Sequence, residues 1–268
     1  MPTLASLNRY KAAGIHLAIS AAVAVVVLAL LLLVWYPQPY FRLAGGAGLM
    51  LILIGVDVVT GPLLTLIVFN PAKKSLKLDL AVIAALQVAA LAYGITVIAQ
   101  ARPVFVVFAG DRFTVVAANQ IDPESLASAK PPFDTLPLDG PRIVGARMPA
   151  DPAERERVML LLASGIDLPN LPRYYVPFAD VVADLRAKAR PIDTLEARDA
   201  QARGAVAATL ARSQRTRESL GWAPVVGRLE IGSAIVDCSR VSCTRTGRPT
   251  ARDSSTASAD TSSAQLRP

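Results

Sequence analysis

The feature that most constrains this chain is a long apolar stretch with one charged side chain near its middle. Between Leu43 and Ala72 that side chain is Asp57. A run of this length and apolarity predicts a membrane-spanning helix rather than the core helix of a soluble domain. An ionised carboxylate at the centre of such a helix costs about 2.5 to 3.5 kcal/mol, so it needs a partner, water or a proton. Asp57 is therefore the first candidate functional residue.

Small and helix-loosening residues surround Asp57. Gly55 and Gly61 allow another backbone to approach closely, and Pro62 loosens the ladder of helical hydrogen bonds. In the next apolar run, Gln87 is a candidate hydrogen-bond partner for Asp57. The pattern indicates a surface for another helix. An Asp that is only hydrogen-bonded inside a helix bundle explains the pattern as well.

The composition indicates a membrane protein with a water-facing part. Of the 268 residues, 53 % are hydrophobic. Residues 1–100 contain six basic and two acidic side chains, whereas residues 101–268 contain twenty-two and nineteen. Because the second part is nearly balanced in charge and lacks interleaved basic and aromatic side chains, no nucleic-acid partner is expected.

Three apolar runs determine the expected fold class. They predict transmembrane helices at about residues 15–36, 44–69 and 80–101. These helices form a transmembrane domain at residues 12–101, which is followed by a small periplasmic α+β domain at residues 102–237. Residues 238–268 are rich in Ser, Thr, Ala and Arg, so they are expected to form a disordered tail.

Basic residues determine the expected orientation. They are Arg9, Lys11, Lys73, Lys74 and Lys77. The first two precede the first apolar run, and the three lysines lie in the loop at residues 70–79. Because positive charge marks the cytoplasmic side, residues 1–11 and this loop are expected in the cytoplasm. The α+β domain is then expected on the periplasmic side of a bacterial inner membrane.

His16 is the only histidine of the chain, and it lies at the basic edge of the first apolar run. A lone histidine has no partner ligands for a metal. Two roles stay open: an interfacial side chain that reaches headgroups or a carbonyl, and a partner for a group in another helix. Since residues 101–268 contain no histidine, Ser-His and Cys-His nucleophile pairs are excluded there. We expect no enzymatic activity, no cofactor and no metal site.

Sequence patterns also predict the secondary structure of the second part. A β-hairpin is expected in residues 102–119, with its turn at Gly110 and Asp111. Asp151 and Pro152 begin a helix. Further elements are expected as helices at 178–189 and from 193 onward, strands at 223–229 and 231–236, and a proline-rich loop at 122–149.

Cys238 and Cys243 lie in the expected tail. The periplasm oxidises thiols, so a disulfide between them is chemically possible. A bridge over so short a loop removes little chain entropy, and we therefore expect no structural importance for it.

Several short motifs lie between Arg9 and Asp122. They are Arg9-Tyr10-Lys11, Gly14-Ile15-His16, Trp35-Tyr36-Pro37, GVDVVTGPLLTLIVFNPAKKSLKLDL, Tyr93-Gly94 and RPVFVVFAGDRF. Together they resemble the TfpX/TfpZ-type type IV pilin accessory proteins. The resemblance implies a chaperone-like inner-membrane helper in type IV pilus biogenesis. It implies a major or minor type IV pilin as partner, with other pilus assembly proteins as further partners.

The expected binding surface follows from these residues. A pilin helix docks against the second apolar run, while the globular head of the pilin meets the periplasmic domain. In lipid, small residues that allow close approach and a hydrogen-bonded polar pair would stabilise such a contact. The candidate partner-binding residues are Asp57, Gly55, Gly61, Pro62, Gln87 and His16. The alternative function is a small membrane transporter or ion-coupled component in which Asp57 binds a proton or cation.

Overall fold

The computed structural model describes residues 8–37, 40–45, 48, 50–51, 54–198, 202–213, 216–238 and 264–267. The chain divides into two compact units. The helical unit comprises residues 1–37 and 45–102, and the sheet unit comprises residues 38–44 and 103–268.

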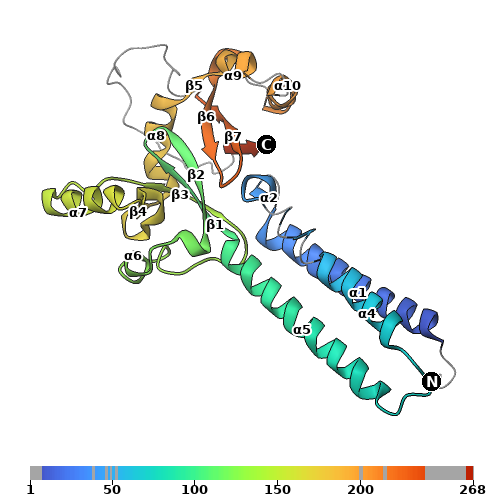
Figure 1. The fold of residues 1–268 in the computed structure, drawn as a ribbon. Helices are drawn as coiled ribbons and strands as arrows, with labels where there is room; N and C mark the ends of the chain where they lie inside the picture. Colours follow the sequence, from blue (N-terminus) through green and yellow to red (C-terminus); the bar gives the residue numbers. More distant parts are fainter. Residues whose placement is uncertain are drawn as a thin grey trace. The chain divides into compact units, whose positions relative to one another are not determined.

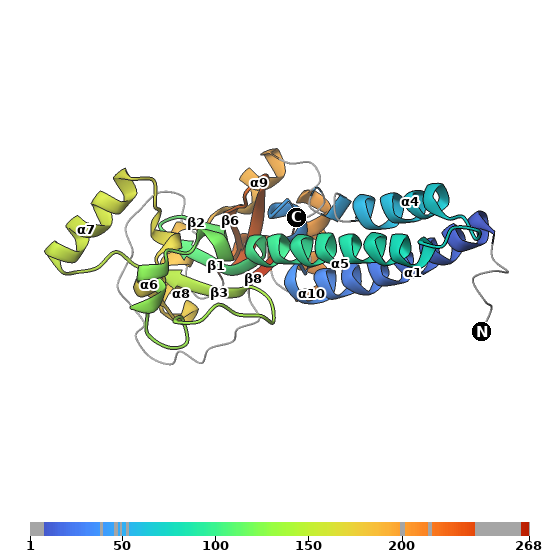
Figure 2. The same ribbon diagram turned by 60° about the horizontal axis from the view of Figure 1, so that its bottom comes forward.

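The helical unit consists of long helices that run side by side (Figure 1 and Figure 2). Its elements are α1 (Arg9–Leu30), the π-helical η2 (Leu31–Trp35), the π-helical η3 (Gly55–Thr60), α4 (Gly61–Val68) and α5 (Leu76–Ala101). The side chain of Asn8 caps α1 by accepting a hydrogen bond from the backbone N–H of Lys11. α4 packs against both α1 and α5.

The prediction of three transmembrane helices is wrong for the described residues. Two helices there are long and apolar enough to cross a membrane, Arg9–Trp35 and Leu76–Ala101, and the remaining apolar helix is the shorter Asp57–Val68. The apolar run at residues 44–69 predicts one continuous helix. In the structure its start is a turn in which Gly45 has a φ of 74°, a left-handed conformation that interrupts a helix.

The two long helices expose most of their apolar side chains. In the most apolar stretch of each helix, only 11 % is buried. Exposed side chains include Ile19, Val25, Val26, Leu33, Leu86 and Val88. The core helix of a soluble domain would be largely buried, so these helices indicate association with a membrane.

The π-helical segment η3 ends at Thr60, two residues before Pro62. A proline inside a helix has no N–H to donate, and its ring collides with the carbonyl one turn earlier. The wider turn of a π-helix accommodates such a residue, and π-helical turns are frequent at functional sites. Asp57 therefore lies in the irregular part of this helix, where backbone carbonyls lack their usual partners.

The sheet unit is built on a mixed sheet whose strand order is β4-β3-β1-β2-β6-β7-β8, with β5 paired to β6. The strands are β1 (Pro103–Ala109), β2 (Arg112–Ala117), β3 (Arg142–Ala146), β4 (Tyr175–Val176), β5 (Arg190–Pro191), β6 (Leu220–Val226), β7 (Ile231–Asp237) and β8 (Ala264–Arg267). The pairs β1–β3 and β2–β6 are parallel, and the other pairs are antiparallel.

The helices of this unit are α6 (Pro123–Ala127), α7 (Pro152–Ala163), α8 (Phe178–Lys188), α9 (Ile192–Arg198) and α10 (Ala202–Ser213). Buried side chains of α8, α9 and α10 pack with side chains of the strands, whereas α7 projects away from the sheet (Figure 1). Short 3-10 turns connect the elements, at Ala118–Gln120, Leu168–Asn170, Pro172–Tyr174 and Arg217–Ser219. Val181 and Leu185 of α8 pack on one face of β1, against Val106 and Phe108, and Tyr175 packs on the other face, against Phe105. Burial of β1 on both faces explains why its sequence is continuously apolar.

The segment α2 (Tyr40–Leu43) belongs to the sheet unit although it follows the first long helix in sequence. Tyr40 and Leu43 are buried in the core cluster that contains α8. Burial raises the pKa of Tyr40 to about 12. The N–H of Leu229 donates to the carbonyl of Leu43 at 3.4 Å, and a side chain at Gly227 would collide with that carbonyl. The connection between the first two apolar runs is therefore a packed element of the sheet unit.

Several predicted elements of the sheet unit are confirmed. β1 and β2 form the predicted hairpin, and Gly110 in its turn has a φ of 69°. The carboxylate of Asp151 caps α7 by accepting from the N–H of Glu154 at 2.9 Å. The two late strands are β6 and β7, and β6 lies beside β2 of the hairpin.

Two predictions for the sheet unit are wrong. The proline-rich stretch at residues 122–149 contains α6 and β3, because the short apolar run of β3 pairs with the distant β1. The tail predicted to be disordered from residue 238 onward begins with a buried, disulfide-bonded Cys238, and Ala264–Arg267 pairs with β7. Cys243 and the other residues between 239 and 263 lie outside the described residues.

Candidate functional site

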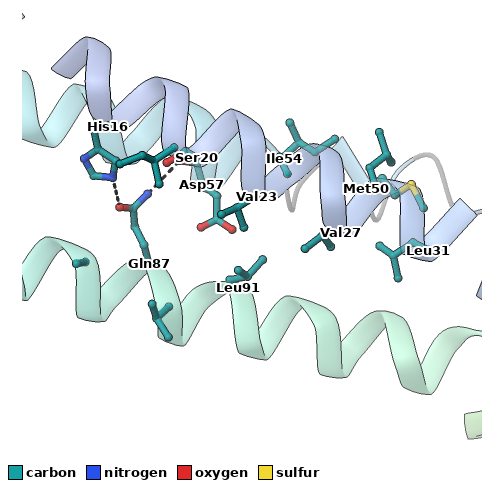
Figure 3. A pocket seen from close by; sticks show the side chains of 15 residues that line it. His16, Ser20, Val23, Val27, Leu31, Met50, Ile54, Asp57, Gln87 and Leu91 are labelled. Atoms are coloured by element: carbon teal, nitrogen blue, oxygen red, sulfur yellow. Dashed lines mark hydrogen bonds between the residues drawn. The ribbon is translucent and has the colours of Figure 1, made fainter. Parts of the chain in front are cut away.

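A groove in the helical unit brings together most of the residues singled out in the sequence (Figure 3). Its volume is about 210 Å³, and it is lined by residues of α1, η2, η3 and α5 together with Met50 and Ile54. The lining is mostly aliphatic, with Val23, Val27 and Leu91 among the labelled side chains. The polar side chains of the lining are His16, Ser20, Asp57 and Gln87.

A chain of hydrogen bonds closes one end of this groove. Nδ1 of His16 lies 2.6 Å from the hydroxyl of Thr65, and Nε2 of His16 lies 2.5 Å from Oε1 of Gln87. Nε2 of Gln87 donates to the backbone carbonyl of Asp57 at 3.0 Å. These contacts connect α1, η3, α4 and α5, so one polar network joins all the helices of the groove.

The directions of these hydrogen bonds follow from their chemistry. The carbonyl of Asp57 can only accept, so the amide nitrogen of Gln87 faces it and the amide oxygen faces His16. That oxygen also only accepts, so Nε2 of His16 carries a proton and donates it. In this tautomer Nδ1 accepts from the hydroxyl of Thr65.

Local sequence explains why the carbonyl of Asp57 is available. In a π-helical turn that carbonyl faces residue 62, which is five positions further on, and Pro62 has no N–H. Gly61 leaves the space through which the amide of Gln87 approaches, because a Cβ at this position would overlap that amide. Pro62 thus leaves the carbonyl of Asp57 open as an acceptor, and Gly61 leaves the space through which Gln87 reaches that carbonyl.

The side chain of Asp57 faces the groove without a polar partner. Asp57 is 9 % exposed. Among the described residues, no group donates a hydrogen bond to its buried Oδ1. Figure 3 shows the carboxylate pointing into the space between α1 and α5. A buried acceptor without a donor costs free energy, about 1 to 3 kcal/mol for a neutral group and more for a charged one. This oxygen is therefore a place where a donor on a ligand is favoured.

The structure separates the predicted site residues into two groups. His16, Asp57, Gly61 and Gln87 lie together, and Pro62 is buried next to them. Gly55 is exposed, with no atom near the position of a Cβ, so it is not part of the groove. Gln87 binds the backbone of Asp57 rather than its carboxylate.

Thr65 is the residue of the network that the sequence analysis missed. It is 2 % exposed and lies on α4, three residues after Pro62. A buried hydroxyl in an apolar helix is a candidate for an interhelical hydrogen bond. A threonine is common in such helices, so its position alone does not reveal its partner.

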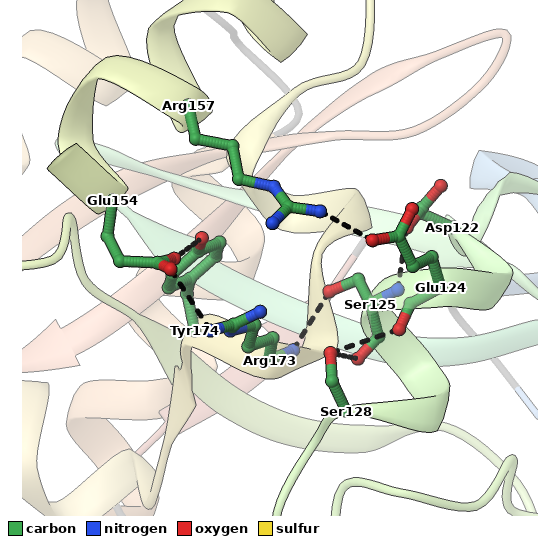
Figure 4. Close-up of polar contacts among 8 residues, drawn as sticks. All are labelled: Asp122, Glu124, Ser125, Ser128, Glu154, Arg157, Arg173 and Tyr174. Atoms are coloured by element: carbon green, nitrogen blue, oxygen red, sulfur yellow. Dashed lines mark hydrogen bonds and ion pairs between the residues drawn. The ribbon is translucent and has the colours of Figure 1, made fainter.

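A second polar cluster lies in the sheet unit (Figure 4). Glu154 accepts from Arg173 at 3.1 Å and from the hydroxyl of Tyr174 at 2.7 Å, while Arg157 pairs with Glu124 at 2.5 Å. Burial, followed by the bond to Glu154, raises the pKa of Tyr174. Since these charges pair with one another around a cavity of only about 50 Å³, the cluster stabilises the contact between α6 and α7 rather than offering a ligand site.

The described residues contain no group of three or more His, Cys, Asp or Glu side chains that could hold a metal ion. In the groove, Asp57 stands as a single carboxylate in an aliphatic lining. This arrangement can accept hydrogen bonds from an apolar ligand that carries a donor.

Comparison with known proteins gives consistent matches. Residues 6–45 match a family described as "Fimbrial assembly protein FimB". The chain is 34 % identical over 184 residues to "Fimbrial assembly protein, serogroup I" of Dichelobacter nodosus, which covers 68 % of this chain and 72 % of that protein. It is 33 % identical to the serogroup E1 protein of that organism, also over 184 residues, which cover 68 % of this chain and 72 % of that protein. It is 39 % identical over 121 residues to the serogroups C1 and C2 protein, over 44 % of this chain and 92 % of that protein. No solved structure matches the chain significantly.

The overlap between a Cβ at residue 61 and the amide of Gln87 gives a first prediction. Gly61→Ala forces Gln87 away from His16 and Asp57, and we expect a loss of about 1 to 3 kcal/mol of stability, typical of overpacking. Thermal unfolding of the full chain in detergent measures the effect. Gly55→Ala is the matched control, because its Cβ meets nothing within 4 Å. Equal effects of the two substitutions would show that Gln87 does not lie against Gly61.

Proposed function

Since this chain belongs to the family of fimbrial assembly proteins, we propose that it assists the assembly of fimbriae by binding an apolar helix of a pilin, the fimbrial subunit, in the groove of the helical unit. It acts without catalysis, as a chaperone-like partner of major or minor pilins and of other assembly proteins. The single observation that carries this proposal is the aliphatic groove with Asp57 facing it.

The dimensions of the groove favour a helix that lays one face along it. A volume of about 210 Å³ accepts a few side chains rather than a whole molecule. A bound helix presents such a face through side chains at positions i, i+3, i+4 and i+7. The lining runs along α1 in the same periodicity, from His16 through Ser20, Val23 and Val27, and continues to Leu31 at the start of η2.

The surroundings of the groove explain how a helix could be selected there. Between helices in lipid there is no hydrophobic driving force, so shape and polar contacts decide the pairing. The outer surfaces of α1 and α5 carry exposed aliphatic side chains such as Val26 and Leu86, which lipid solvates equally well. The groove differs from these surfaces by its shape and by its carboxylate.

A transporter with Asp57 as its ion site is less well supported by the same geometry. A bound cation requires several oxygen ligands, and the groove offers a single carboxylate among aliphatic side chains. The polar groups of His16, Thr65 and Gln87 are engaged with one another.

We further propose that the helical unit lies in the bacterial inner membrane. Arg9 and Lys11 begin α1, and Lys73, Lys74 and Lys77 precede or begin α5. His16, early in α1, meets Gln87 near the middle of α5, whereas the hydroxyl of Tyr36, just after η2, donates to the carbonyl of Ile98 near the end of α5. α1 and α5 are therefore parallel, and their basic starts share one end of the unit. By the positive-inside rule that end is cytoplasmic, and the sheet unit after Arg102 is periplasmic.

Photo-crosslinking in cells that make fimbriae tests the docking proposal. A photoreactive amino acid at Val23 or Leu91, which line the groove, is expected to capture the pilin. The controls are Val26, on the same helix as Val23, and Leu86, on the same helix as Leu91; they are 69 % and 62 % exposed and do not line the groove. A pilin that is captured equally from all four positions, or only from the controls, contradicts docking in the groove.

Reporter fusions test the proposed orientation. An enzyme that is active only in the periplasm is expected to be active when fused after Gln120 and silent when fused after Lys74, because α5 separates these positions. Two fusions of the same activity would mean that α5 does not cross the membrane. The reverse pattern would place the lysines outside the cytoplasm.

A further inference from the structure

We infer that the helix bound in the groove carries a cationic amine that binds the carboxylate of Asp57. The inference rests on the proposed function, and it specifies the chemistry of the partner: an apolar helix with one protonated amine at the level of Asp57. Three observations lead to it.

The first observation is that the carboxylate lacks a donor within the unit. Oδ1 is buried and receives no hydrogen bond from any described residue, and the described ion pairs do not include Asp57. Rotation about χ2 exchanges the two carboxylate oxygens, so either of them can meet a ligand. A carboxylate in an aliphatic lining gains most from a cationic donor, because charge-assisted hydrogen bonds are about twice as strong as neutral ones.

The second observation is that the neighbouring polar groups are already engaged. The amide nitrogen of Gln87 donates to the backbone carbonyl of Asp57, and its amide oxygen accepts from Nε2 of His16. Nδ1 of His16 accepts from the hydroxyl of Thr65. Ser20 also lines the groove, but the structure records no hydrogen bond between it and Asp57, both of which are described. The network thus holds the backbone of Asp57 in place and leaves its side chain to an external donor.

The third observation is the charge of the lining. Its residues include one carboxylate and no lysine or arginine. The basic side chains of the helical unit lie outside the lining: Arg102 follows the end of α5, and the others stand near the starts of α1 and α5, where Lys73 pairs with Asp79 at 2.6 Å. Charge complementarity therefore favours a cation on the partner over a second anion or a purely aliphatic face.

Synthetic helices test this inference without using pilin. Apolar peptides of about 20 residues, long enough to span a bilayer, carry at their centre lysine, glutamine or norleucine, which is similar in size to lysine but has no amine. Their binding to the full-length chain in phosphatidylcholine vesicles is measured by fluorescence energy transfer. We expect the lysine peptide to bind about tenfold more tightly than the norleucine peptide, with glutamine in between.

Variants of the protein assign the preference to one side chain. Asp57→Leu is expected to bind the lysine and norleucine peptides equally. Asp57→Asn keeps an acceptor without charge, and we expect it to remove the difference between the lysine and glutamine peptides. Asp79→Asn is the matched control, since it removes the carboxylate paired with Lys73 and is expected to keep the full preference.

Three results would overturn the inference. They are equal binding of all peptides to the unchanged protein, a preference for lysine that survives in Asp57→Leu, and loss of the preference when phosphatidylethanolamine replaces phosphatidylcholine. The last result would mean that Asp57 binds an amine of the lipid. If the lysine peptide shows no preference, the capture of pilin by photo-crosslinking in cells is still expected. If pilin is not captured, the preference for the lysine peptide can still be measured, so the two proposals can fail separately.

Discussion

The hydrogen bonds of Gln87 are the interactions on which the helical unit depends. This side chain, on α5, reaches His16 on α1 and the backbone of Asp57 in η3. In the membrane location that we propose for this unit, helices gain nothing from burying aliphatic side chains against one another, so such polar contacts and close approaches at small residues would fix their positions. Gly61 makes the approach possible, and Pro62 leaves the carbonyl of Asp57 open to receive the amide. Beyond this closed end the helices leave a groove, and no described residue donates a hydrogen bond to the Oδ1 of Asp57 that lines it.

The sheet unit is stabilised by a different principle. Its central strand β1 is buried on both faces, and aliphatic and aromatic side chains from α8 and from the segment around Tyr175 cover it. The short segment α2 adds Tyr40 and Leu43 to the same core. The chain therefore leaves the first long helix and enters the core of the sheet unit within a few residues, before it returns to the helical unit at residue 45. A fragment that starts at Pro103 would lack this part of its core.

Local patterns in the sequence account for a large share of the structure. The hairpin of β1 and β2, the cap at Asp151 and the pairing of β6 with β7 follow from turn, capping and apolar patterns that act over a few residues. His16, Asp57, Gly61 and Gln87 were recognisable because polar or small residues in apolar runs require an explanation. The prediction of three transmembrane helices was wrong for the described residues, because an apolar run does not show where a regular helix gives way to a turn, as at Gly45, or to π-helical turns, as at Gly55–Thr60. β3, α2 and the role of Thr65 depend on partners that are distant in sequence, which no local pattern contains.

The central claim, that His16 and Gln87 close one end of a groove lined by Asp57, has a direct spectroscopic test. Because His16 is the only histidine, nitrogen-15 labelling of histidine gives the signals of one imidazole ring in the full-length chain. In lipid vesicles, Gln87→Ala is expected to shift mainly the signal of Nε2, and Thr65→Val mainly that of Nδ1, because each ring nitrogen has its own partner. If neither substitution changes the ring signals, His16 is not part of the network, and the groove is not held as described.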